Sequence, residues 1–266
     1  MTAAPLDYAR RAWMKAVFAV AFLFLYFPIA ALVVFSFNAG TRGVAWEGFT
    51  LAHYVKAHGN AQLHEAFVNS LVVAVVSSAM ATVLGAGLGV GLQRFRFSGR
   101  AAFEGWLYLP VAIPEICMAV ALLAFFAALD IDLGLPTVIA GHVAFSIPFV
   151  ALVVRARYRR FDPALAEASR DLGASEWQTF RRVVLPYLAP ALAAGALLAF
   201  TLSIDDFVIT FFTTGPGSTT LPVKIYSMVR LGVSPEINAA STVLIALTAA
   251  LVVLASRLQG RKALAP

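Results

Sequence analysis

Long apolar runs are the feature of this sequence that most constrains its fold. Of the 266 residues, 61% are hydrophobic and 13% are charged, whereas soluble domains are nearer half apolar and a quarter charged. The excess is concentrated in runs of about 18 residues or more, and such a run is long enough to cross a bilayer core of ~30 Å. The sequence therefore predicts an all-α, polytopic membrane protein with six transmembrane helices, at 16–37, 67–92, 105–129, 137–154, 186–212 and 237–255.

The lysines and arginines are divided unequally between the two sides that these spans define. Of the 20 lysines and arginines, only Arg42, Lys56, Lys224 and Arg230 lie in the loops on one side. The others lie on the side that holds both termini. Cytoplasmic loops carry this excess of basic residues, so both termini are predicted to be cytoplasmic. The net charge of +6 thus reflects membrane topology and does not indicate binding of nucleic acid.

The largest segment on the cytoplasmic side, residues 155–185, is predicted to form two short amphipathic helices. Asp162 before Pro163 is typical of the start of a first helix, and Gly173 of its left-handed end. Ser175 and Gln178 have the spacing of a capping box, which starts a second helix. The apolar faces comprise Ala164, Leu165, Ala168 and Leu172, then Trp177, Phe180 and Val184. Patterning alone leaves open a surface that binds a partner protein and an amphipathic loop lying on the membrane.

Three carboxylates stand inside the predicted spans without a basic residue in any span. A charge in a span costs about 2.5–3.5 kcal/mol on insertion scales, so such residues usually face a polar path and meet a ligand or a proton. At ~1.5 Å per residue from the cytoplasmic ends, Glu115 lies about 15 Å deep and Asp205 about 28 Å deep, followed by Asp206. Acids at separated heights suit an elongated cation. The alternative is that Asp205 and Asp206 lie in the headgroup region and only cap their helix.

Four histidines and Ser203 are of residue types that can also bind a metal, relay protons or act as a nucleophile. The outward loop 38–66 contains three irregularly spaced histidines, His53, His58 and His64, and this spacing favours an ordinary loop over a metal site. His142 lies in the fourth span, where a helix–helix hydrogen bond is favoured over a proton relay. Ser203 has no histidine or lysine at short spacing, which argues against an intramembrane enzyme.

Enzymatic use of ATP by this chain is also not expected. The cytoplasmic segment is too small for a nucleotide-binding domain, and the chain contains no GxxxxGK[ST] motif of the kind that binds nucleotide phosphates. The sequence therefore predicts a subunit without cofactor or metal.

The cytoplasmic segment resembles the EAA loop of the permeases of type I ABC importers. The resemblance rests on Glu167-Ala168-Ser169, then Gly173 after three residues, Val183 after nine more, and Leu185-Pro186. Ser169 stands where alanine is usual. In that family the loop docks into a cleft of the ATPase subunit and carries its motion to the spans. The resemblance implies the MetI-like permease fold and a coupling loop at residues 162–184, with Glu167, Ala168, Gly173 and Glu176 in the coupling contact.

Most of the chain is similar to the second permease subunit of spermidine/putrescine importers, which implies a polyamine cargo. The matching stretches lie between residues 36 and 239, and the Ser-x-Asp-Asp block ending at Asp206 and the Lys-Ile-Tyr-Ser-Met block at 224–228 are the most specific. The family's substrate-handling acids correspond to Glu115, Asp205 and Asp206, with Ser203 beside them. Glu115 stands where aspartate is usual, and His53 stands where the relatives carry an aromatic residue, which implies an altered substrate preference.

The residues and the resemblances together predict one permease domain, 1–266 with a core at about 64–257, in the bacterial inner membrane. The implied partners are a homologous second permease subunit, two ATPase subunits and a periplasmic substrate-binding protein, with the lipid bilayer around them. Two alternatives stay open. One is an ABC-importer permease for another small organic cation or an amino-acid derivative. The other is a proton-coupled carrier or channel, whose uptake would persist without ATP.

Overall fold

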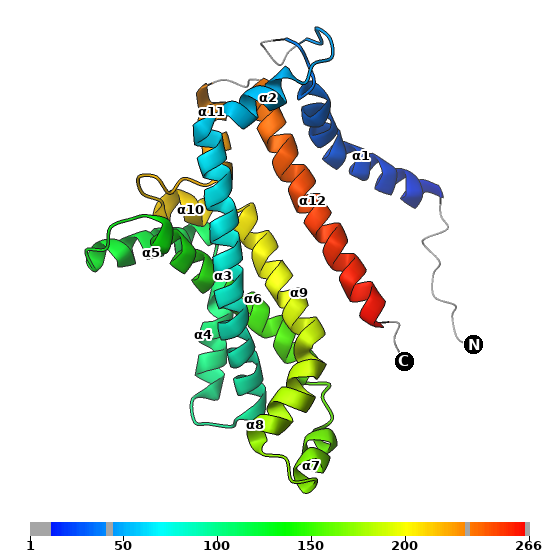
Figure 1. The fold of residues 1–266 in the computed structure, drawn as a ribbon, viewed down its shortest axis with the longest axis vertical. Coiled ribbons are helices and arrows are strands. Elements are labelled where there is room, and N and C mark those ends of the chain that lie inside the picture. The colour runs from blue at the N-terminus through cyan, green and yellow to red at the C-terminus, as the bar shows by residue number, and fades with distance from the viewer. Residues whose placement is uncertain (1–11, 41–44, 232–234, 264–266) are drawn as a thin grey trace. The chain divides into compact units, whose positions relative to one another are not determined.

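The computed structural model describes residues 12–40, 45–231 and 235–263, and most of them are helical (Figure 1). These residues divide between two compact units. One unit comprises the described residues up to Asn60 together with Ser227–Ile245, and the other comprises Ala61–Tyr226 together with the described residues from Ala246 onward. The division falls within helices α11 (Leu221–Leu231) and α12 (Pro235–Ala263).

In the first unit, helix α1 (Ala12–Phe35) leads through a short folded loop into helix α2 (Ala52–Gly59). The buried side chain of Asn38 organises this loop, because its amide donates to the Ala45 carbonyl at 2.6 Å and accepts from the Glu47 backbone N–H at 2.7 Å. His53 is buried here as well, with its Nε2 atom 3.0 Å from the Asn38 carbonyl. The segment 38–66 was predicted as an ordinary loop, and the structure instead places α2 within it.

The second unit is built on three long helices, α3 (Ala61–Arg94), α6 (Leu135–Tyr158) and α9 (Leu185–Ile204), which pack against one another. Small residues on α3 permit the close approach. A Cβ atom on Gly85 would lie 2.8 Å from the Ile147 carbonyl oxygen, and one on Gly89 would lie 2.7 Å from that of Ala151. Small residues bring membrane helices together in this way. The apolar core between the three helices contains Ala81, Val150, Val154, Phe161, Val184, Leu188 and Ala199.

The short helices of this unit lie at different levels along the bundle (Figure 1). Helices α7 (Pro163–Asp171) and α8 (Glu176–Thr179) lie at the end where α6 stops and α9 starts. Helix α4 (Arg100–Ala112) contacts α6, whereas α10 (Val208–Thr213) packs on both α6 and α5 (Glu115–Ala128). Helices α7 and α8 form the predicted cytoplasmic segment. Helices α4, α5 and α10 position the acidic residues.

The predicted spans agree with the helices except at two breaks. Among the described residues, four helices are long and apolar enough to cross a membrane, Trp13–Phe35, Ala61–Arg94, Leu135–Tyr158 and Glu176–Ile204. The third predicted span is instead a helix pair, α4 and α5, bent by 109°. The fifth predicted span, 186–212, stops at Ile204 and resumes as α10. The sixth, 237–255, lies inside α12, which has 29 residues but is not among the four helices above, so the predicted count of six spans is not reproduced in the described residues.

Candidate functional site

Two interruptions of membrane helices meet in the second unit. Helix α4 gives way to α5 at Ile113 and Pro114, and helix α9 gives way to α10 at 205–207. Helices α5 and α10 pack against each other, so the two interruptions come together. Backbone that leaves the helix at membrane depth is tolerated only inside protein or beside a water-filled cavity, because lipid cannot satisfy its polar groups. The interruptions therefore indicate a polar region within the membrane part of the chain.

The three intramembrane acids lie at these interruptions. Glu115 is the first residue of α5 and is half-buried. Asp205 follows the last residue of α9 and is exposed, and Asp206 is buried at 8% exposure. The carboxyl groups of Glu115 and Asp206 lie close enough to interact with each other. The prediction that Glu115 and the aspartates lie at separated heights is therefore wrong, because the count along one straight helix does not hold across the 109° bend.

Asp206 lies two residues before Val208, the first residue of α10, and its side chain bonds to the start of that helix. Its carboxylate accepts from the backbone N–H groups of Thr210 at 2.9 Å and of Ile209 at 3.4 Å, and from the Thr210 hydroxyl at 3.1 Å. A carboxylate in this position satisfies N–H groups that have no partner inside the helix. Asp206 therefore caps a helix, as the alternative expects, but it does not only cap, because it also contacts His142. The side chain of Asp205 is exposed.

A buried histidine joins these acids to Ser203. The Nδ1 atom of His142 lies 2.6 Å from the Ser203 hydroxyl, and its Nε2 atom lies 3.1 Å from Oδ1 of Asp206. The expectation that His142 makes hydrogen bonds between helices agrees with this geometry. No histidine is close to Ser203 in the sequence. In the structure, however, the packing of α6 on α9 brings His142 next to it. Ser203 is nevertheless buried, so its hydroxyl is not open to a substrate in this conformation.

Two further polar residues of this cluster are not evident from the sequence. Ser77 on α3 donates to the Ser203 hydroxyl at 3.0 Å, and the Thr210 hydroxyl lies 2.9 Å from Nε2 of His142. Thr210 follows Asp206 at a spacing of four residues, and a capping interpretation of Asp206 would have indicated it. Ser77 carries no such signal, because a serine in an apolar helix usually bonds to the backbone of its own helix.

The 162–184 segment has the predicted local structure. Asp162 caps α7 by accepting from the Ala164 N–H at 3.0 Å, and Gly173 has a left-handed backbone with φ of 85°. Ser175 and Gln178 form the reciprocal bonds of a capping box at the start of α8. A π-helical turn, η2 (Phe180–Val184), then connects α8 to α9. Each of these caps depends on residues close in sequence, which is why the pattern predicts them.

The apolar side chains of this segment divide between its interior and its surface. Val184 is buried in the helix core, and Phe180 is partly buried against it. Leu172, Trp177 and Leu165 are exposed, with Leu172 at 89%. The predicted apolar face of the second helix is therefore not a single surface. Glu167, Ala168 and Gly173 are exposed as well and lie on the surface of the segment with this apolar set.

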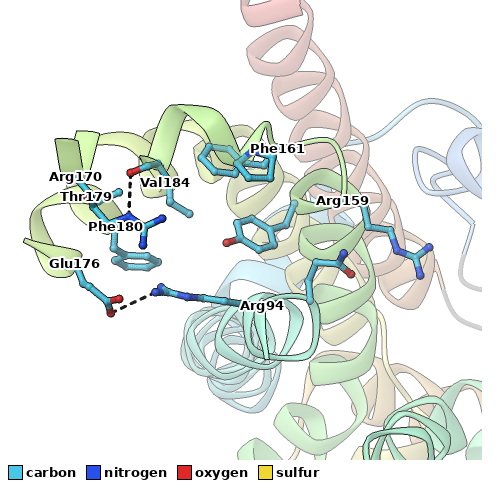
Figure 2. A pocket seen from close by; sticks show the side chains of 12 residues that line it. Arg94, Arg159, Phe161, Arg170, Glu176, Thr179, Phe180 and Val184 are labelled. Carbon is cyan, nitrogen blue, oxygen red and sulfur yellow. Dashed lines mark hydrogen bonds and ion pairs between the residues drawn. The ribbon is translucent and has the colours of Figure 1, made fainter. Parts of the chain in front are cut away.

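A pocket of about 460 Å³ lies between this segment and the ends of α3 and α6 (Figure 2). Arg94 is the last residue of α3, and its side chain points across the pocket to Glu176 of α8. The two form an ion pair with 3.3 Å between a guanidinium nitrogen of Arg94 and Oε2 of Glu176. Phe180 and Thr179 form part of the lining on the α8 side, and Phe161 lines it beyond the end of α6. Glu176 therefore contacts the bundle through Arg94, far along the chain from the acids at the helix interruptions.

An all-helical fold, acids at interrupted membrane helices and a capped surface segment define a class of membrane transport subunit. The chain belongs to the binding-protein-dependent transport system inner membrane component family, whose model matches residues 81–261. It is 43% identical to the spermidine/putrescine transport system permease protein PotC of Escherichia coli K12, with 95% of this chain and 94% of that one covered. It is also 37% identical to the putrescine transport system permease protein PotI of the same strain, with 90% and 88% covered.

Two solved structures share the fold. One is a bacterial ABC transporter involved in the import of the acidic polysaccharide alginate, with a TM-score of 0.73, 19% identity, and 93% of this chain and 94% of that chain covered. The other is the MetNI methionine ABC transporter in an inward-facing conformation, with a TM-score of 0.61, 21% identity, and 76% and 98% covered. The predicted fold class, an ABC-importer permease of the MetI-like type, is confirmed by these likenesses together with the family match.

Proposed function

We propose that this chain is a membrane subunit of an ATP-driven importer whose cargo is a polyamine such as spermidine or putrescine. The observation that carries the proposal is the meeting of the two helix interruptions, which gathers Glu115, Asp205 and Asp206. Within the described residues, no lysine or arginine side chain pairs with any of the three. A cluster of one charge in a cleft concentrates ligands of the opposite charge. The relatives named as spermidine/putrescine permeases support the same cargo.

The three acids are not equivalent in this proposal. Asp205 is exposed and Glu115 is half-buried, so these two carboxyl groups are available to the ammonium groups of the cargo. Asp206 is buried and engaged by α10 and His142, and Ser203 lies behind it. In this proposal Glu115 and Asp205 line the cargo pathway. Asp206 and Ser203 lie behind them and hold the surrounding helices in place.

The 162–184 segment couples this subunit to an ATPase in the proposed assembly. Its exposed apolar residues Leu172 and Trp177 supply a docking surface, and Glu167, Ala168 and Gly173 lie beside them in sequence. Glu176 connects the docked segment to α3 through Arg94. Motion of the ATPase then reaches the bundle both through this ion pair and through the π-helical turn into α9.

The complete importer contains a second, homologous permease subunit, two ATPase subunits that hydrolyse ATP, and a periplasmic binding protein that delivers the cargo. This chain contributes one permease domain with its core at about 64–257, and both its termini lie in the cytoplasm. Alternating access, in which the helices rock between inward-open and outward-open states, moves the cargo past Asp205 and Glu115.

A single substitution tests the role of the exposed acid. Asp205→Asn removes the charge with little change in size, and loss of a hydrogen bond to a charged group costs about 1.5–3 kcal/mol. We expect uptake of radiolabelled spermidine at low concentration to fall more than about tenfold in cells that lack other polyamine uptake. The control is Asp132→Asn, which removes an exposed acid outside the site. Equal uptake by both variants, at equal amounts in the membrane, would refute the assignment.

A further inference from the structure

His142 is the hub of a buried polar cluster that joins four helices. It lies on α6, and its partners are Ser203 of α9 and Asp206 and Thr210 at the start of α10. Ser77 extends the cluster to α3 through Ser203. The side chains of His142 and Asp206 are 1% and 4% exposed. A polar cluster buried this completely is costly unless every member is satisfied.

With a neutral His142, the donors and acceptors of this cluster agree when the ring hydrogen is on Nε2. The Thr210 hydroxyl donates to Oδ1 of Asp206, so toward His142 it can only accept, and Nε2 of His142 must carry the hydrogen. The Nδ1 atom is then an acceptor, and the Ser203 hydroxyl donates to it. Ser203 in turn accepts from Ser77. This tautomer satisfies all the side chains of the cluster, as the donor and acceptor capacities of these groups require.

The position of α6 at this point is set by the preceding residue. A Cβ atom on Gly141 would lie 2.8 Å from Cγ2 of Ile209 on α10 and 3.3 Å from Cδ1 of Leu122 on α5. The absence of a side chain lets α6 approach α10 and α5 closely. His142 is thereby brought within hydrogen-bonding distance of Asp206.

These contacts reach the acids that we assign to the cargo. Asp206 is held by His142 on one side, and its carboxyl group lies close to that of Glu115 on the other. It is also the chain neighbour of the exposed Asp205. The placement of His142 therefore determines where both cargo-facing carboxyl groups lie, although His142 itself is buried and does not reach the cargo.

We propose that His142 is a positioning residue which, through Asp206 and Ser203, fixes the separation of the Glu115 and Asp205 carboxyl groups. The inference depends on the proposed function, since that separation matters only if the two acids receive a cation with ammonium groups at a defined spacing. Loss of His142 then changes the affinity for such cations and the discrimination between shorter and longer ones. The maximal rate of uptake, which depends on the coupling to ATP, changes little.

Uptake kinetics with putrescine and spermidine test this proposal. The cells lack other polyamine uptake and produce this chain with its partner subunits. For His142→Leu we expect KM to rise about tenfold or more, since the bond to a charged group is lost, with an altered ratio of the putrescine and spermidine KM values. His142→Gln keeps an N–H that can reach Asp206 and should restore KM and the ratio. Ser146→Ala, a change of another buried polar residue of α6, should leave both unchanged.

The outcomes separate this proposal from the proposed function. A lower maximal rate and less protein in the membrane, with KM and the cargo ratio unchanged, would mean that His142 is only structural and would overturn the proposal. If His142→Leu does not assemble, His142→Gln and His142→Asn decide, because the shorter asparagine cannot reach Asp206; equal kinetics for these two would overturn it as well. If the unchanged complex takes up neither putrescine nor spermidine, the proposed function itself fails.

Discussion

At the scale of single residues, burial decides which ion pairs hold the second unit together. Arg155 on α6 is 7% exposed at its side chain, and it donates to Glu104 at 2.8 Å and to the Tyr108 hydroxyl at 3.0 Å. Arg94 and Glu176 form a longer pair of 3.3 Å, with side chains 39% and 73% exposed. Removing one partner of a buried pair leaves a charge without compensation, whereas solvent screens an exposed pair. The first pair therefore contributes to the stability of the fold, whereas the second contributes little to it.

Parallel substitutions of the two glutamates measure this difference. Glu104→Gln leaves the buried Arg155 charge without its carboxylate partner, and we expect a clear fall in Tm. Glu176→Gln is the matched control, and its expected cost is about 1 kcal/mol or less. Thermal unfolding of the detergent-purified proteins gives the comparison. A Tm shift of the same size for both variants would contradict the assignment.

At the scale of the elements, the sequence predicted what depends on neighbouring residues. The caps at Asp162 and Ser175 and the left-handed Gly173 involve contacts within a few positions, and the structure has all of them. The helix interruptions were not predicted, although Pro114 lies at one of them. A proline removes one hydrogen bond and fixes one dihedral angle, but the 109° bend also depends on how α5 packs against α10.

In the candidate site, too, the sequence predicts local features but not those that depend on helix packing. Its acids could be named from the sequence because a carboxylate in an apolar run is conspicuous by itself. Their arrangement could not be named, because His142 and Ser203 are 61 positions apart and only the packing of α6 on α9 brings them together. Counting along a straight helix placed Glu115 far from the aspartates, whereas the bend places it against Asp206.

The α3–α6 interface offers a test of element packing with an internal control. A Cβ atom on Gly89 would lie 2.7 Å from the Ala151 carbonyl oxygen, whereas one on Gly87 would meet no atom within 4 Å. Gly89→Ala forces the helices apart and should destabilise the protein by about 1–3 kcal/mol. Gly87→Ala should be neutral or stabilising by up to about 1 kcal/mol, because alanine is the better helix former. Thermal unfolding in detergent measures both, and a loss of stability in Gly87→Ala matching that in Gly89→Ala would contradict the packing argument.

At the scale of the whole molecule, the fold by itself does not select the cargo. The same fold occurs in a transporter involved in the import of an acidic polysaccharide, which has the opposite charge to a polyamine. Function on a shared fold depends on the site. In this chain the candidate site is acidic, and the 162–184 segment lies at the opposite end of α9. In our proposal, cargo recognition and coupling are therefore separated.

The central claim, cation import driven through the 162–184 segment, is tested most directly by uptake into liposomes. The purified importer is reconstituted with ATP inside and the binding protein and labelled spermidine outside. We predict accumulation that requires ATP hydrolysis, is competed by putrescine and is unaffected by neutral sugars. Gly173→Val, which places a β-branched residue at a positive φ, should abolish it, and Gly173→Asn should retain it. Spermidine uptake without ATP, or ATP-driven uptake of neutral sugars with no response to diamines, would contradict the account.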